Sequence, residues 1–505
     1  MSVRVAALVV ATVAAAAPLR AEVPGPASRP VPASQPASAP TTAPASQPTA
    51  PADPYAGMDH TGTPKLPARG DQLPPSSAGP GARRPVPRYD GRPDEVASAG
   101  EVLAWIPRVA LFPVHAVLEY GVRWPIVKGI TLAEKHHLFA RTKELFTFKD
   151  GKAGVFPTIF YDFGLTPSLG LYFFSSDMGR SSNNLVLQAG FWPTGGWLHL
   201  SGHDSFKVFR NDAGTVTLRS DLIYRPDRVF AGLGHDSLAN ERFFRLRQTE
   251  VEANLRASLG DLNRASLGLV YRNARITNGQ DPGVADATSP FASDLQREVP
   301  GFGQTHNLLA FQARLELDTR SPERIFTPGS GLRLELGTSA HFDPSDPSLS
   351  FLRYGGEAAG FLDLTHHNHV LALRFHVELL EPLGEDAVPI TERIAMGGPE
   401  RMRGFLAGWL RGDSAMETTL DYRYPIHMMV DANLFVSLGN TFNGRFEQLH
   451  AKRLRMCWGF GLRTNTSREV SFDFMVAAGT NMLERWSDDF EVDHVRVLVG
   501  INQGF

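Results

Sequence analysis

The residues of this sequence that could do chemistry are few, and the clearest group is a run of histidines. His366, His367 and His369 occur in the segment THHNH, and imidazole nitrogens are common metal ligands. The run falls in a tight turn between two strand-like segments, whereas a structural metal site needs about four convergent ligands. We therefore expect a solvated turn, and we predict no metal site and no cofactor.

Sequence motifs that would build a catalytic centre are absent. The chain has no GxSxG elbow, no P-loop and no HExxH helix. The absence of these motifs disfavours a serine-hydrolase site, a nucleotide-phosphate loop and a zinc-protease site. Its one cysteine, Cys457, excludes a disulfide framework and a paired redox centre. We expect Cys457 to be a small lining residue, and we predict that the protein is not an enzyme.

Charge and hydropathy narrow the class of protein. The 505 residues carry 50 Lys and Arg against 53 Asp and Glu, a net charge of −3. This balance argues against nucleic acid as a partner, because binding to phosphates needs a clustered positive field. No long uncharged apolar run occurs beyond the extreme N-terminus, which excludes a bundle of membrane-spanning helices. A soluble β-rich protein and a transmembrane β-barrel remain.

The N-terminal part of the chain divides by composition. Residues 1–21 have an early arginine, an apolar run and a small residue at the end, which predicts a secretory signal peptide. Residues 22–98 are rich in Pro, Ala, Ser and Thr and hold nearly half of the 37 prolines. Such a segment buries too little apolar surface to offset its ordering entropy. We expect it to be a disordered linker.

Residues 99–150 have a different pattern, in which large apolar residues mix with charges. The charges make a membrane-spanning helix unfavourable, and amphipathic packing or an interfacial position fits better. Pro107, Pro113 and Pro125 should break the segment into short helices. We expect these helices at the periplasmic mouth or the membrane interface.

From residue 151 to 505 the period of the hydrophobic pattern becomes two. Leu371, Leu373 and Phe375, for example, alternate with charged or small residues. One face of each segment is thus apolar and the other polar, which is typical of β-strands. We count sixteen such segments, and bacterial single-chain barrels have an even number of strands.

The connections between these segments separate a barrel from a soluble sandwich. Connections after even-numbered strands are short, whereas several after odd-numbered strands are long, above all 383–414. Barrels with both termini in the periplasm have this asymmetry. The chain also ends in Phe505, an apolar terminus of the kind that outer-membrane strands present. We therefore predict an all-β transmembrane barrel of sixteen antiparallel strands, preceded by the helical segment and the linker.

Several motifs, in a fixed order, resemble the outer-membrane assembly-barrel superfamily, the BamA/TamA or bacterial surface antigen family. The longest connection contains GGPERMRGFLAGWLRGD (397–413), and its Arg403, Gly404 and Phe405 match the family's Arg-Gly-Phe loop tip. The other matching pieces are FAGLGHDS (230–237), LDTRSPERIFTPGSGLRLELG (317–337), LDYRYPI (420–426), LFVSLGN (434–440) and GFGLRTNT (459–466). The resemblance covers about residues 155–505. The family's periplasmic POTRA modules are not recognisable in 22–98, so we expect a member without them.

The resemblance implies a loop that folds back into the barrel, with its arginine on an acidic wall residue. A guanidinium in a partly desolvated site needs a carboxylate for its forked donors. Alternation places Glu417, Asp421, Asp473 and Asp318 on the inner side. Of these candidate partners of Arg403 we favour Asp473.

The resemblance also implies a function without covalent chemistry. The leading hypothesis is a protein-insertion or translocation barrel whose first and last strands can separate toward lipid, so that a client strand pairs with the open edge. The alternative is a passive or plugged transport channel; a barrel enzyme comes third. We expect a monomeric barrel in bacterial outer-membrane lipid, with outer-membrane or secreted proteins as candidate clients.

Overall fold

The computed structural model describes fourteen stretches of the chain. They are 99–137, 144–162, 165–176, 183–192, 196–208, 214–235, 242–260, 262–280, 288–289, 299–320, 330–365, 369–427, 430–464 and 472–501. The predicted signal peptide, the whole of the predicted linker, His366, His367 and Phe505 lie outside these stretches.

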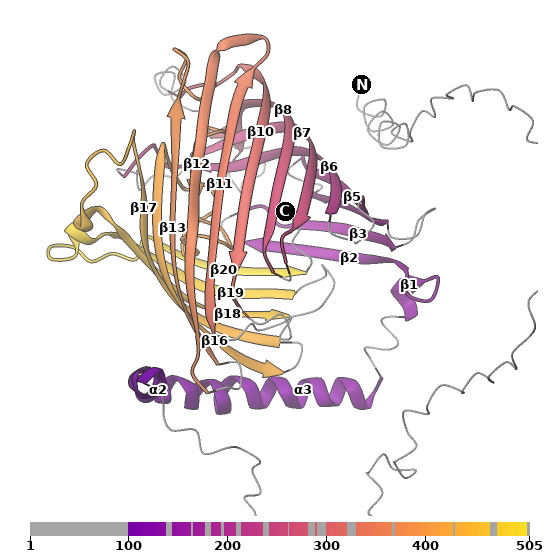
Figure 1. The fold of residues 1–505 in the computed structure, drawn as a ribbon, viewed down its shortest axis with the longest axis vertical. Helices are drawn as coiled ribbons and strands as arrows, with labels where there is room; N and C mark the ends of the chain where they lie inside the picture. The colour runs from indigo at the N-terminus through magenta and orange to yellow at the C-terminus, as the bar shows by residue number, and fades with distance from the viewer. Residues whose placement is uncertain are drawn as a thin grey trace, which may run out of the picture. The chain divides into compact units, whose positions relative to one another are not determined.

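Sixteen antiparallel strands form a closed barrel, as the sequence predicts (Figure 1). Each strand pairs with its neighbours along the chain, and the first and last strands pair with each other to close the sheet. The strands are β2 (Ala153–Asp162), β3 (Ser168–Ser176), β4 (Asn184–Trp192), β5 (Trp197–Lys207), β6 (Gly214–Phe230), β7 (Arg242–Ser258), β8 (Arg264–Gln280), β10 (Thr305–Asp318), β11 (Gly331–Asp343), β12 (Asp346–Asp363), β13 (Val370–Pro382), β16 (Ser414–His427), β17 (Val430–Phe442), β18 (Arg455–Thr464), β19 (Phe472–Met482) and β20 (His494–Ile501).

Four short strands accompany the barrel. β1 (Thr147–Phe148) pairs with the beginning of β2, and β9 (Thr288–Ser289) pairs with the end of β8. The long connection between β13 and β16 contains a hairpin of its own, β14 (Ile394–Met396) with β15 (Leu410–Gly412). The sequence predicts this connection only as a loop.

The alternation of side chains sets the two faces of the wall. On β13, Leu373 is 55% exposed and Phe375 is 43% exposed. His376, the residue after Phe375, is buried. The opposite residue Leu420 on β16 is paired with Leu373 and is likewise exposed. The apolar set therefore faces outward and the polar set faces the lumen, the interior of the barrel.

The helical segment is continuous from residue 99 to 135. It consists of α2 (Ala99–Val117), a π-helical turn η1 (Leu118–Arg123) and α3 (Trp124–Lys135). The prediction that three prolines break it into short helices is wrong, because Pro107 and Pro113 lie inside α2 and Pro125 is the second residue of α3. Each internal proline removes a backbone donor, but packing of one helix face on the barrel offsets that local cost.

The helices cross the end of the barrel where the short turns lie (Figure 1). Arg108 donates to the backbone oxygen of Leu364, which directly follows β12. Arg123 donates to the backbone oxygen of Ile426, near the end of β16. Tyr424 donates to Glu119. In the stretches that the structure describes, no helix is both long and apolar enough to cross a membrane.

Candidate functional site

The tip of the long connection is buried inside the barrel. Met402, Phe405 and Trp409 are at most 1% exposed and pack in one cluster with inward residues of the wall, among them Phe435 and Cys457. Hydrophobic burial thus holds the Arg-Gly-Phe tip against the wall instead of leaving it in solvent.

Arg403 binds a carboxylate of β16. Its Nη2 lies 3.2 Å from Asp421 Oδ2, and the side chains are 11% and 2% exposed. The guanidinium carbon lies 4.4 Å from the centre of the Phe435 ring, a cation–π arrangement. Arg374 adds a second positive charge 3.8 Å from the same carboxylate. Asp421 is therefore the anchor for two arginines, one from the loop and one from the wall.

The prediction that Asp473 is the partner of Arg403 is wrong. Asp473 Oδ1 accepts a hydrogen bond from Nε of Arg463 at 2.7 Å, and Arg463 is 64% exposed. Both aspartates face inward, so the alternation of side chains cannot distinguish them. Their positions along the barrel axis differ. Asp473 lies at the short-turn end of β19, whereas the loop tip stops at the level of Asp421.

Glu417 holds the backbone of the tip. Its Oε1 accepts a hydrogen bond from the Met402 amide at 2.7 Å. Met402 has a φ of +43°, a conformation that costs free energy for a residue with a side chain. The glutamate therefore fixes a strained turn directly before Arg403.

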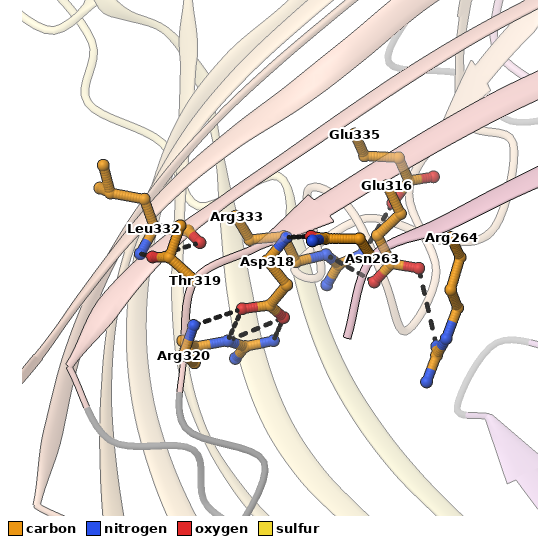
Figure 2. Close-up of polar contacts among 9 residues, drawn as sticks. All are labelled: Asn263, Arg264, Glu316, Asp318, Thr319, Arg320, Leu332, Arg333 and Glu335. Carbon is orange, nitrogen blue, oxygen red and sulfur yellow. Dashed lines mark hydrogen bonds and ion pairs between the residues drawn. The ribbon is translucent and has the colours of Figure 1, made fainter. Parts of the chain in front are cut away.

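Asp318 serves a different structure, shown in Figure 2. It accepts hydrogen bonds from Arg320 Nε at 2.9 Å and Nη2 at 2.5 Å, and its own amide donates to Asn263 at 2.8 Å. Between them, the Thr319 hydroxyl accepts from the Leu332 amide at 2.9 Å. The Asp-Thr-Arg element thus ties the β10–β11 hairpin to the turn before β8, and Asp318 does not contact Arg403.

Gly404 and Phe405 fit the tip against β19 and β20. A Cβ atom on Gly404 would lie 2.3 Å from the backbone oxygen of Ala478, so only glycine allows this approach. The Phe405 ring lies 5.2 Å from Trp409 and 5.3 Å from His494, the first residue of β20. The loop therefore spans the lumen wall from β16 to the last strand.

The base of the loop is held by residues Gly234 and His235 of the family-like segment FAGLGHDS. The Gly234 amide donates to the Arg411 oxygen at 2.7 Å. His235 contacts Arg453 at 2.6 Å and stacks on Phe442. Segments far apart in sequence thus meet where the long connection enters the barrel.

The first and last strands pair with each other along one seam of the barrel. In the described residues, β2 and β20 share four paired positions, from Ile159 with Ile501 to Asp162 with Leu498. Each of these strands shares eight positions with its other neighbour. The register places residues 155–158 opposite 502–505, which lie outside the described stretches.

An ion pair that the sequence analysis missed crosses this seam. Arg496 on β20 donates to both carboxylate oxygens of Asp162 on β2, at 2.6 and 2.5 Å, and both side chains are 2% exposed. Arg496 also donates to the backbone oxygen of Arg403 at 3.2 Å. One guanidinium therefore joins the first strand, the last strand and the loop tip. Pro157 was an available signal for the seam, because proline occurs in edge strands.

The lumen beside the tip contains a charged cavity of about 960 Å³. Its wall carries paired charges, including Arg401 with Glu357 at 3.0 Å and Arg353 with Glu378 at 2.5 Å. No group of three or more metal-binding side chains occurs in the described stretches. His369 instead contacts Tyr424 and His115, with ring centroids 4.7 and 5.3 Å away.

A family model and several solved structures match this chain. The Omp85 superfamily domain matches residues 174–480. Similar solved structures include BamA from Haemophilus ducreyi lacking POTRA domains 1–3, with 13% identity, a TM-score of 0.48, and coverage of 69% of this chain and 70% of that one. CdiB from Acinetobacter baumannii matches with 12% identity and a TM-score of 0.44, over 69% of this chain and 59% of that one. CdiB from Escherichia coli matches with 13% identity and a TM-score of 0.42, over 68% and 62%. No curated protein matches the chain.

Proposed function

Because this chain belongs to the Omp85 superfamily, we propose that it is an outer-membrane barrel that inserts or translocates client proteins. Export by an N-terminal signal peptide and residence in bacterial outer-membrane lipid are part of this proposal. The described residues before the barrel form α2, η1, α3 and the short strand β1.

The buried ion pair across the seam is the observation that carries the proposal, because it joins the two strands whose separation would open the barrel. Opening the barrel there would break the backbone pairs between β2 and β20 as well as this ion pair. Each unpaired backbone group in lipid costs free energy, so an open seam is stable only if another strand pairs with it. A client strand with free N–H and C=O groups satisfies that need by edge addition.

The loop tip is proposed to control this opening. Arg403 is anchored on β16 through Asp421, and its backbone oxygen is bound by Arg496 of β20. Separation of β2 from β20 requires Arg496 to leave Asp162, and the loop then becomes the remaining polar contact of Arg496. This function exchanges hydrogen bonds and needs no catalytic residue.

A disulfide lock across the seam tests the proposal. In a Cys457→Ser background, Tyr161→Cys with Val499→Cys joins an outward-facing position of β2 to its paired position on β20. Leu171→Cys with Ala189→Cys is the matched control, because it joins β3 to β4 at an equivalent outward pair.

We expect oxidation of the seam pair to abolish insertion of an unfolded eight-stranded barrel protein into vesicles holding the protein. Reduction should restore it, and the control pair should have no effect. Insertion at an unchanged rate through a locked seam would overturn the proposal.

A plugged transport channel is the second candidate, favoured by the charged cavity of about 960 Å³. Its wall carries both signs of charge, which gives no ion preference. In planar bilayers, a channel should conduct when Arg403→Ala frees the loop, and it should conduct equally with the seam locked. An insertase should lose its activity when the seam is locked.

A further inference from the structure

The helical segment lies on the outer wall of the barrel, as the strand register shows. Tyr422 and Tyr424 follow Leu420 at every second position of β16, so they share its outward face, and Ile426 lies in the bulge that follows them. Leu420 is 46% exposed, whereas these three are at most 6% exposed. Their pairing partners Leu434 and Ala432 on β17 lie on the same face.

The helix is what covers these outward residues. Leu118 is 3% exposed in a cluster with Tyr422, Tyr424 and Ala432. The helix residues that pack around this cluster are Leu111, Val114, Val122, Ile126 and Val127. The segment therefore covers part of the outward apolar belt at the short-turn end. Leu373 and Val436 flank Leu420 on the neighbouring strands, and both remain uncovered.

The opposite face of the helix is also apolar and has no protein partner in the described residues. Large side chains on it are 58–77% exposed: Trp105, Ile106, Val109, Phe112, Val117, Tyr120 and Trp124. Contiguous exposed patches of this kind mark interaction surfaces. Trp and Tyr are typical of the membrane–water interface, because their rings are amphipathic.

We propose that this face is immersed in lipid, so that residues 99–135 form an interfacial helix embedded in the leaflet around the short-turn end. The inference rests on the barrel lying in a membrane, as proposed above. Continuity supports lipid over a protein partner, because the face extends an apolar belt that surrounds it. Lys128 stands with its Nζ 3.6 Å from the centre of the Trp124 ring, a cation–π contact that places a positive charge beside this apolar face.

Quenching by brominated lipid tests this placement. In the Cys457→Ser background, a polarity-sensitive fluorophore is attached to Val109→Cys or Phe112→Cys, and the full chain is placed in phosphatidylcholine vesicles. Leu373→Cys on the belt is the positive control. Leu449→Cys, exposed in the long connection between β17 and β18, is the negative control.

We expect the fluorophores at 109 and 112 to lose intensity in lipid brominated near the headgroup, and less in lipid brominated deep in the chains. The fluorophore at 373 should be quenched, and that at 449 should not. Quenching at 373 without quenching at 109 and 112 would overturn the interfacial helix alone. Absence of quenching at 373 would show that the barrel is not in lipid, and the proposed function would fail with it. A neighbouring protein or copy over the helix would also prevent quenching, so that outcome counts against the inference.

Discussion

Arg496 and Asp162 lie 334 residues apart in sequence and form a bidentate ion pair inside the barrel, across the line where the sheet closes. Both are nearly fully buried. A planar guanidinium matches a carboxylate with two parallel hydrogen bonds, which gives direction as well as attraction. The closed state of the seam is therefore specified by side chains as well as by backbone pairs.

Asp162→Ala should destabilise the closed barrel strongly. It leaves the buried Arg496 without a counter-charge, and loss of one partner of a buried pair costs about 3–5 kcal/mol. The free energy of unfolding in urea, measured in vesicles, should fall by that amount. The matched control is Arg445→Ala, which breaks the exposed pair with Glu381 and should cost at most about 1 kcal/mol. Equal effects of both substitutions would contradict a stabilising role of the Arg496–Asp162 ion pair at the seam.

Arg403 should be coupled energetically to Asp421 and not to Asp473. A double-mutant cycle of Arg403→Ala with Asp421→Ala should give a coupling of about 1–3 kcal/mol, because the two groups share a buried ion pair. The cycle with Asp473→Ala should be additive within about 0.5 kcal/mol, since Asp473 binds Arg463. Heat resistance of the folded band on a gel gives a second measure. Coupling to Asp473 alone would show that the tip sits lower than the structure places it.

Gly404→Ala should displace the loop tip. The added methyl group would meet the Ala478 carbonyl oxygen at 2.3 Å and its carbon at 2.5 Å, and such overpacking costs about 1–3 kcal/mol. Gly337→Ala is the control, because a Cβ there meets nothing within 4 Å. Protease protection of the 397–413 segment in intact vesicles should fall for Gly404→Ala only. Unchanged protection in both variants would mean that the tip does not pack on β19.

Acid should weaken the attachment of the helix to the barrel. Burial raises the pKa of Glu119, but hydrogen bonds from Tyr424 and Arg123 outweigh it and hold the pKa below the ordinary value of 4.5. A carboxyl whose pKa is lowered on folding stabilises the folded state above its unfolded pKa, and this contribution is lost as pH falls through the folded pKa.

Amide exchange of residues 111–127 should therefore be slow at pH 7 and rise below about pH 4.5, relative to the intrinsic rate at each pH. Glu119→Gln should remove this dependence on pH, and Glu134→Gln, at a site with no such contact in the described residues, should preserve it. A wild-type profile that stays flat to pH 3 would contradict the role of Glu119.

The strands and their faces could be predicted from the sequence because they depend on local order. The alternation in segments such as Leu371–Phe375 is a property of neighbouring residues, and β-geometry converts it directly into an inner and an outer face. The count of sixteen and the long connection at 383–414 follow from the same pattern. The motif at Arg403 also pointed to the correct loop.

The partner of Arg403, the path of the helix and the seam were decided only by the tertiary structure. Phase tells which side of the wall Asp421 and Asp473 face, but their height relative to the loop depends on how deeply the tip packs. Pro107 and Pro113 would break an isolated helix, and only the barrel surface beneath Leu111 and Leu118 provides the burial that offsets them. Asp162 and Arg496 meet because sixteen strands close into a barrel. The register with which the first and last strands pair is not encoded in any local sequence pattern.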